Sequence, residues 1–131
     1  MSSSYSAFAL AVVVTGSALA LGCSSSTDSS PQSTQPASRD EAARATCSKL
    51  SECNEIGPGK TYESADQCTV KQRANWDTLW PPQDCDGKIE QTAYNNCLEE
   101  IRRAECGNSV DLANIVLNKC AKAKVCSGST T

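Results

Sequence analysis

The stretch Tyr-Asn-Asn-Cys-Leu-Glu-Glu-Ile-Arg-Arg-Ala-Glu-Cys, residues 94–106, carries the clearest structural pattern in this chain of 131 residues. Its apolar positions recur at the spacing i, i+3, i+4, i+7 and i+10, and they are Tyr94, Cys97, Leu98, Ile101 and Ala104. This spacing predicts an amphipathic helix with one buried face. We expect the helix to start at Thr92 or one turn earlier and to end at Gly107.

Two helical patterns precede this stretch. The first opens at Ser38, has Glu41 at capping-box spacing and runs to about Glu55, with the apolar stripe Ala43, Cys47 and Leu50. The second opens at Ser64, with Gln67 as its capping-box partner, and Pro81-Pro82 ends it. Its stripe includes Cys68, Trp76, Leu79 and Trp80.

A fourth helical pattern follows, with Ser109 as the predicted N-cap. Its expected buried stripe is Ala113, Val116, Leu117 and Cys120, and Lys119, Lys122 and Lys124 at its C-terminal end complement the helix dipole. No alternating strand pattern competes with the four helices. The prediction is therefore an all-α, four-helix domain over residues 39–126, followed by a disordered tail at 127–131.

The chain has nine cysteines, an odd number. Eight lie in the predicted domain, and a small exported domain with eight cysteines is typical of four structural disulfides. These eight are Cys47, Cys53, Cys68, Cys85, Cys97, Cys106, Cys120 and Cys126. Eight cysteines allow 105 pairings. Cys47 and Cys53 cannot bond each other within an intact helix, and short loops place the end of helix one beside the start of helix two. These considerations favour Cys53–Cys68 and leave the other pairings open.

Trp76, Trp80 and Tyr94 form the candidate binding surface. The two tryptophans lie four residues apart on helix two and suit an exposed anchor for a partner or ligand. The alternative is that they pack in the core under the disulfides. An apolar pocket lined by these rings would favour the first interpretation, and full packing would favour the second.

The composition argues against several kinds of chemistry. The chain has no His, which excludes His-based acid–base catalysis and His metal ligands, and it has no Cys-x-x-Cys motif. The segment Asp84–Glu90 weakly resembles part of a calcium loop, but an ordinary Asp-Gly turn explains it better. Glu99 and Arg103 predict an ion pair on a solvated helix face. We expect no enzyme activity, no metal and no cofactor, and a net charge of −3 argues against a nucleic-acid partner.

Residues 1–22 carry no charged side chain and contain an apolar run, with small residues near their end, as in an export signal. Ala18-Leu19-Ala20 suits ordinary signal peptidase, whereas Ala20-Leu21-Gly22-Cys23 resembles a bacterial lipobox. We favour the lipobox, in which Cys23 is lipidated and becomes the new N-terminus. The lipid would anchor the protein to a membrane, and this use of Cys23 leaves an even number of cysteines for the fold.

Residues 23–38 are predicted to be the lipidated cysteine and a disordered tether. The segment after Cys23 consists of Ser, Thr, Pro, Gln, Ala and one Asp, and it has too little apolar area to fold. The expected location is the cell envelope, with the outer membrane favoured and the domain in the periplasm or at the cell surface.

Several motifs resemble one family. They are Cys47-x5-Cys53-Asn54, then Ile56-Gly57-Pro58-Gly59-Lys60-x-Tyr62-x-Ser64, the later Cys97-Leu98-x-x-Ile101-x4-Cys106, and the closing Cys120-x5-Cys126. This pattern is similar to the myxobacterial small cysteine-rich lipoproteins of unknown function that are labelled natural product biosynthesis lipoproteins. The resemblance implies an association with biosynthetic gene neighbourhoods, and it supplies no catalytic or binding residues.

The leading hypothesis is thus a non-enzymatic, lipid-anchored envelope lipoprotein, an accessory or binding module for an unknown protein or small molecule. The alternative is a structural or protein-interaction domain, including an inhibitor-like one. An enzyme or redox protein is the third hypothesis, and it would need a reactive thiol.

Overall fold

A computed structural model describes residues 33–107 and 109–128 of the chain. These residues form six helices, which are α1 (Gln35–Glu52), α2 (Ala65–Leu79), α3 (Pro82–Cys85), α4 (Gln91–Arg103), α5 (Ser109–Asn118) and α6 (Lys122–Val125). The described residues contain no strand, and an isolated bridge joins Ile56 to Tyr62. The predicted all-α class is confirmed. The predicted signal segment, Cys23 and the tether as far as residue 32 lie outside the described residues.

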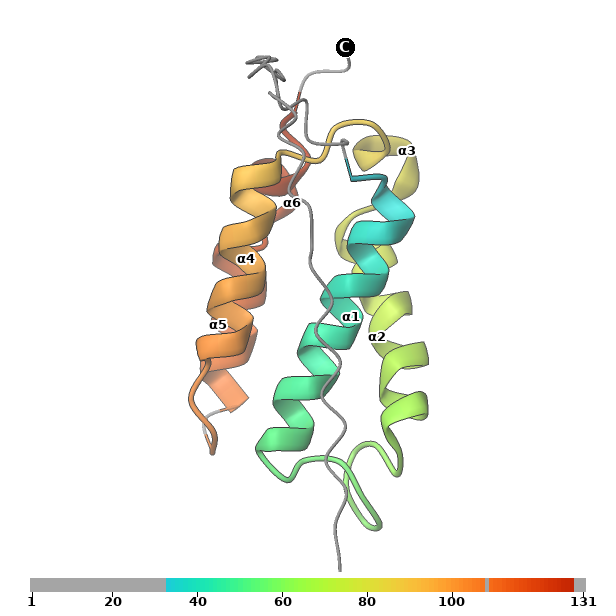
Figure 1. The fold of residues 1–131 in the computed structure, drawn as a ribbon, viewed down its shortest axis with the longest axis vertical. Coiled ribbons are helices and arrows are strands. Elements are labelled where there is room, and N and C mark those ends of the chain that lie inside the picture. Colours follow the sequence, from blue (N-terminus) through green and yellow to red (C-terminus); the bar gives the residue numbers. More distant parts are fainter. Residues whose placement is uncertain (1–32, 108, 129–131) are drawn as a thin grey trace, which may run out of the picture.

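The four longer helices form two antiparallel hairpins, α1–α2 and α4–α5, which stand side by side (Figure 1). Both hairpins begin at the same end of the molecule, where α3, α6 and the start of α4 gather; we call this the closed end. At the opposite end lie the connections around residues 53–64 and 104–107, which we call the loop end. Two short helices, α3 and α6, were not predicted from the sequence.

The first helix begins three residues earlier than predicted. α1 starts at Gln35, with Pro36 in its first turn, where the missing N–H of proline costs no helix hydrogen bond. Ser38, the predicted cap, is buried inside the helix instead. The Gln35 side-chain amide donates to Asp77 Oδ1 at 3.3 Å and to the backbone oxygen of Trp80, which holds this turn on α2. Residues 35–38 therefore belong to the folded domain and not to the tether.

The caps of the other helices agree with the sequence in part. Ser64 Oγ accepts from Gln67 N at 3.2 Å, which confirms the predicted cap of α2. The Glu90 carboxylate caps α4 by accepting from the backbone N–H groups of Thr92 and Ala93. These two bonds lower the pKa of Glu90. Ser109 is the first residue of α5 rather than its N-cap.

The predicted fourth helix is divided in two. α5 ends at Asn118, and α6 carries Lys122 and Lys124 after a turn at Cys120. The sulfur of Cys120 is bonded to Cys97, and its backbone oxygen accepts the indole N–H of Trp80 at 2.8 Å. These two interactions fix the position of Cys120, just after the chain leaves α5.

The C-terminal boundary also differs from the prediction. Gly128 N donates to the backbone oxygen of Lys88 at 2.9 Å. A Cβ built on Gly128 would lie 2.9 Å from that same oxygen, so this close approach requires glycine. Residues 127 and 128 therefore belong to the domain, and residues 129–131 lie outside the described part.

The eight domain cysteines form four disulfides: Cys47–Cys68, Cys53–Cys106, Cys85–Cys126 and Cys97–Cys120. The first of these joins α1 to α2, and the last joins α4 to Cys120, just after the end of α5. The other two join one hairpin to the other, Cys85–Cys126 at the closed end and Cys53–Cys106 at the loop end. The predicted Cys53–Cys68 pairing is wrong, because Cys68 lies one turn inside α2 and faces Cys47, whereas Cys53 follows the end of α1 and meets the second hairpin.

Candidate functional site

Trp76, Trp80 and Tyr94 do not form a binding surface. Their exposed fractions are 2, 0 and 2%, and they lie together in the core. The two tryptophan rings have centroids 4.5 Å apart, and the Tyr94 ring meets Trp80 edge to face at 6.0 Å. This geometry is favourable for aromatic pairs. The core interpretation is therefore correct, and the exposed-anchor interpretation is wrong.

The aromatic cluster also fixes the two hairpins to each other. Tyr94 on α4 reaches α1, where its hydroxyl donates to Glu41 Oε2 at 2.8 Å and lies 3.2 Å from the Ser38 backbone oxygen. Burial and the neighbouring Glu41 carboxylate raise the pKa of Tyr94, so the phenol stays neutral. The three aromatic rings of the closed half are thus fully packed in the core.

The loop half is packed less closely. α5 packs on α4 and makes few contacts with α1 or α2. Between α5 and the first hairpin lies a hollow of about 650 Å³, within the range of ligand-binding pockets. We call it the interhairpin groove. Its walls come from the second half of α1, the 53–62 connection, the middle of α2, the segment that follows α4, and α5.

One wall of the groove is apolar. On α5 it is lined by Leu112, Ala113 and Val116, and Leu50 and Ala104 continue it on α1 and after α4. The predicted buried stripe of this helix was Ala113, Val116, Leu117 and Cys120. In the structure Ile115 and Cys120 are buried, Ala113 is exposed, and Leu117 is 65% exposed. That part of the prediction is wrong, because nearly every side of α5 carries apolar residues and its packing on α4 selects Ile115.

The opposite wall is polar. Thr46, Gln72 and Asn75 line it together with the Tyr62 hydroxyl, which accepts from Gln72 Nε2 at 2.8 Å. Lys49 also lines the groove, and its ammonium is paired with Glu52 Oε2 at 3.2 Å. The groove therefore combines an apolar wall with neutral hydrogen-bonding groups, which is the usual composition of a ligand site.

The rim of the groove carries two carboxylates. Glu55 and Glu105 both line it and both are exposed. The Cys53–Cys106 disulfide, whose Cα atoms are 5.1 Å apart, brings the two chain segments that carry them to the same end of the groove. Sequence reasoning did not find this site, because its walls come from segments that only this disulfide and the helix packing bring together.

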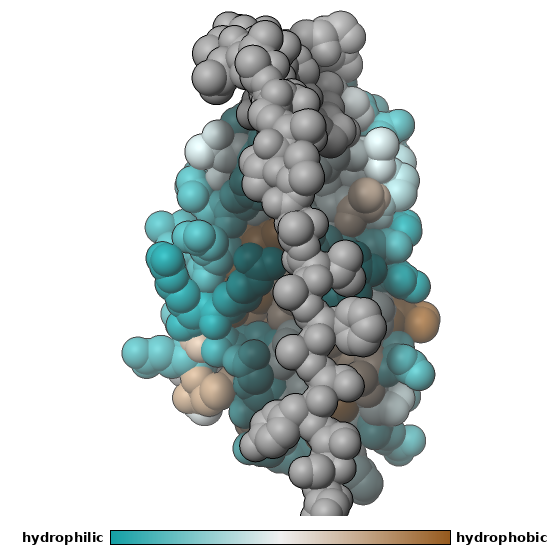
Figure 2. Space-filling model, in the orientation of Figure 1, coloured by the Kyte–Doolittle hydropathy of each residue, from teal (hydrophilic) through white to brown (hydrophobic). Residues whose placement is uncertain are grey.

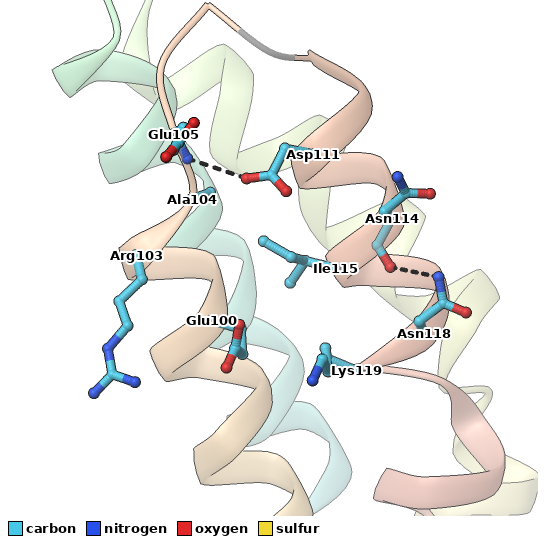
Figure 3. Close-up of a pocket in the computed structure, with 9 residues that line it drawn as sticks. All are labelled: Glu100, Arg103, Ala104, Glu105, Asp111, Asn114, Ile115, Asn118 and Lys119. Atoms are coloured by element: carbon cyan, nitrogen blue, oxygen red, sulfur yellow. Dashed lines mark hydrogen bonds between the residues drawn. The ribbon is translucent and has the colours of Figure 1, made fainter.

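A second hollow of about 550 Å³ lies between α4 and α5 (Figure 3). Charged groups of both signs line it, including Glu100, Arg103 and Lys119, and Figure 3 shows the Arg103 side chain directed away from α5. Asp111 Oδ2 accepts from Glu105 N at 3.1 Å across its upper part. Its mixed charge and small apolar area make it a weaker candidate than the groove. The predicted surface pair Glu99–Arg103 is present on α4 at 3.3 Å.

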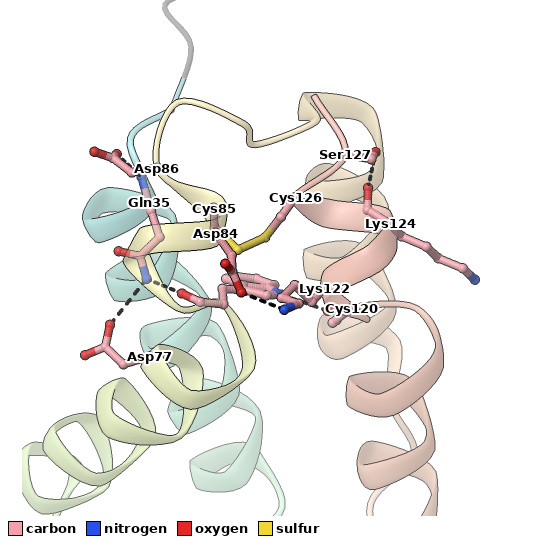
Figure 4. The surroundings of a disulfide bond; sticks show 11 residues. Gln35, Asp77, Asp84, Cys85, Asp86, Cys120, Lys122, Lys124, Cys126 and Ser127 are labelled. Carbon is pink, nitrogen blue, oxygen red and sulfur yellow. Dashed lines mark hydrogen bonds and ion pairs between the residues drawn. A yellow bond between two sulfur atoms is a disulfide. The ribbon is translucent and has the colours of Figure 1, made fainter. Parts of the chain in front are cut away.

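The Asp84–Glu90 segment is a structural turn. Asp84 pairs with Lys122 at 2.7 Å beside the Cys85–Cys126 disulfide (Figure 4), and this ion pair lowers the pKa of Asp84. Gly87 adopts a φ of 68°, which suits an Asp-Gly turn. Across the described residues, no three His, Cys, Asp or Glu side chains are grouped so that they could hold a metal ion.

Two further surface properties bear on partners. No helix in the described ranges is both long and apolar enough to cross a membrane. On the face shown in Figure 2, the coloured surface is largely hydrophilic, with hydrophobic residues in small separate areas. The large hydrophobic side chains most exposed in the described part are Val70 and Leu117.

Comparison with known proteins gives one match. The profile of a family of unknown function (DUF6184) matches residues 47–128, which span all four disulfides. No curated protein matches the chain. No solved structure matches it either.

Proposed function

The chain belongs to this family of unknown function, and we propose that it is a non-enzymatic, lipid-anchored protein of the bacterial cell envelope that binds a partner molecule in the interhairpin groove. The observation that carries the proposal is the groove itself. It leaves apolar residues of α5 uncovered in a domain that four disulfides cross-link. Uncovered apolar surface of this kind is typical of binding sites.

The described chain begins at the end of the domain opposite the groove. The described chain enters at the closed end, where Ser33 Oγ donates to Gln91 Oε1 at 3.0 Å. The groove lies at the loop end, and α1, with 18 residues, spans about 27 Å between the two. Ser33 lies ten positions after Cys23, so a lipid on Cys23 would hold the start of the described chain within about 35 Å of the membrane.

Binding is proposed rather than catalysis because of the groove's lining. Apart from Lys49 and the two rim carboxylates, the groove is lined by apolar, hydroxyl and amide groups, and the chain has no His to act as a base beside them. The association with natural product biosynthesis, the myxobacterial origin and the outer-membrane location are the finer parts of the proposal. They rest on the resemblance of the cysteine motifs and on the lipobox-like segment.

The second candidate function is a protein-interaction module, including an inhibitor-like one. The observation in its favour is Leu117, which is 65% exposed and extends the apolar surface of α5 beyond the groove. A protein partner that covers α5 would contact Leu117 together with Val116. A small molecule held in the groove would contact Val116 but not Leu117.

The anchor is tested by labelling cells of the native host with radioactive palmitate. The wild-type protein should be labelled and found in the membrane fraction, and Cys23→Ala should lose both properties. The control variant Ser24→Ala, which changes the neighbouring residue, should keep both the label and the membrane association. An unlabelled, soluble wild-type protein would overturn the lipid anchor.

A further inference from the structure

We propose that the interhairpin groove takes a small cationic amphiphile, that is, an apolar molecule with a protonated amine. This inference rests on the proposed binding function and adds the chemical class of the ligand. It is carried by an apolar wall, a pair of unneutralised carboxylates at one end of that wall, and a neutral polar wall opposite.

The apolar wall selects the body of the ligand. Leu112 and Val116 lie four residues apart on α5, so they face the same way, and both are only half buried in the domain. Leu50 continues this wall on α1 and is also half buried. A hydrocarbon group placed against these side chains would remove apolar surface of both the ligand and the domain from water.

The carboxylates select the charge of the ligand. The side chains of Glu55 and Glu105 have no hydrogen bond or ion pair with other described residues, although both line the groove. The nearby cation, Lys49, is already paired with Glu52. The rim therefore presents negative charge that the domain itself does not neutralise, and a protonated amine is its complement.

The polar wall suits the remaining functional groups of such a molecule. The Gln72 and Asn75 amides supply both donors and acceptors, and they carry no charge that would oppose a cation. An anionic amphiphile of the same shape would meet two carboxylates at the rim. We therefore expect the groove to discriminate by the sign of the ligand's charge.

The test compares three probes of equal chain length: decylamine, decanol and decanoate. Each is titrated below its critical micelle concentration into the mature chain at pH 7 and low salt, by calorimetry and by NMR shift mapping. Decylamine should bind about tenfold more tightly than decanoate, with decanol between them, because each exposed carboxylate contributes a modest and salt-sensitive attraction. Chemical-shift changes should centre on Val116.

Two pairs of matched variants locate the site. Glu55→Gln combined with Glu105→Gln should remove the preference for the amine while leaving decanol binding unchanged, and Glu63→Gln outside the groove should have no effect. Val116→Ser should weaken all three probes. Leu117→Ser, which removes an exposed apolar residue beside the groove on the same helix, should weaken none.

Equal or tighter binding of decanoate would overturn the inference, and so would an equal loss in Val116→Ser and Leu117→Ser. Binding of an amphipathic peptide in the groove without any binding of decylamine would also overturn it, but would leave the proposed binding function standing. The lipid anchor is judged separately by palmitate labelling of Cys23, so failure of the ligand class and failure of the anchored-protein proposal give different results.

Discussion

At the scale of single residues, the polar atoms of the aromatic core are unequally satisfied. The indole N–H of Trp80 donates to the Cys120 backbone oxygen at 2.8 Å, across the two hairpins. The indole N–H of Trp76, one turn earlier on the same helix, has no acceptor among the described residues. Both rings are buried to the same degree. These two residues therefore separate the contribution of a buried hydrogen bond from that of ring packing.

We expect Trp80→Phe to destabilise the domain more than Trp76→Phe, by about 1–2 kcal/mol. Both changes remove a similar volume, but only the first leaves a buried backbone oxygen without its donor. Urea unfolding with the disulfides intact measures the two free energies of unfolding. Equal losses in the two variants would show that the Trp80 bond contributes nothing to stability.

At the scale of elements, the helix ends show which local signals survive in the folded protein. Ser64 caps α2 as its sequence pattern indicated, because the cap needs only residues within four positions of each other. The same pattern at Ser38 does not form a cap, because Gln35 makes hydrogen bonds to α2 and its C-cap residue Trp80, and α1 therefore begins one turn earlier. A cap is therefore predictable from sequence until a distant element provides a better start for the helix.

The cap of α4 gives a prediction for pH. The pKa of Glu90 is lowered in the folded state, so the folded protein binds fewer protons here than the unfolded chain. Its contribution is fully present above the ordinary glutamate pKa and is lost as the pH falls through the lowered value. Glu90→Gln should therefore be less stable than the wild type at pH 7, and the difference should shrink as the pH falls below about 4.

Thermal unfolding at a series of pH values measures this difference, and Glu63→Gln, which alters no cap carboxylate, is the matched control. A gap between wild type and Glu90→Gln that stays constant down to pH 2 would contradict the assigned role of the carboxylate.

At the scale of the whole molecule, the disulfides follow one plan. One bond closes each hairpin, and one bond ties the hairpins together at each end of the domain. The bonds differ in exposure. Cys106 is exposed and Cys53 half-exposed, whereas both cysteines of the Cys47–Cys68 and Cys97–Cys120 bonds are buried. The bond that borders the groove is thus the most accessible one.

We expect Cys53–Cys106 to be the first disulfide reduced under native conditions, because an attacking thiolate can reach its sulfur atoms without unfolding the core. Graded treatment with dithiothreitol, followed by alkylation and mass spectrometry, measures the order of reduction. Earlier labelling of Cys97 and Cys120 would contradict the assignment.

Loss of the Cys53–Cys106 bond, which closes a loop of 53 residues, should lower the free energy of unfolding by about 2–4 kcal/mol.

The class of the fold can be predicted from the sequence alone, because helix periodicity, Pro and Gly breaks, and cysteine number are local or compositional signals. For Trp76, Trp80 and Tyr94, the sequence left two alternatives open, an exposed binding surface and packing in the core. The tertiary structure decided between those alternatives, and it decided the cysteine pairing, the buried side of α5 and the position of the groove. These depend on which segments meet: Cys53 pairs with Cys106, 53 residues away, and Ile115 rather than Val116 faces α4. The packing of whole hairpins decides such contacts between segments that are distant in the chain. No short stretch of sequence encodes them.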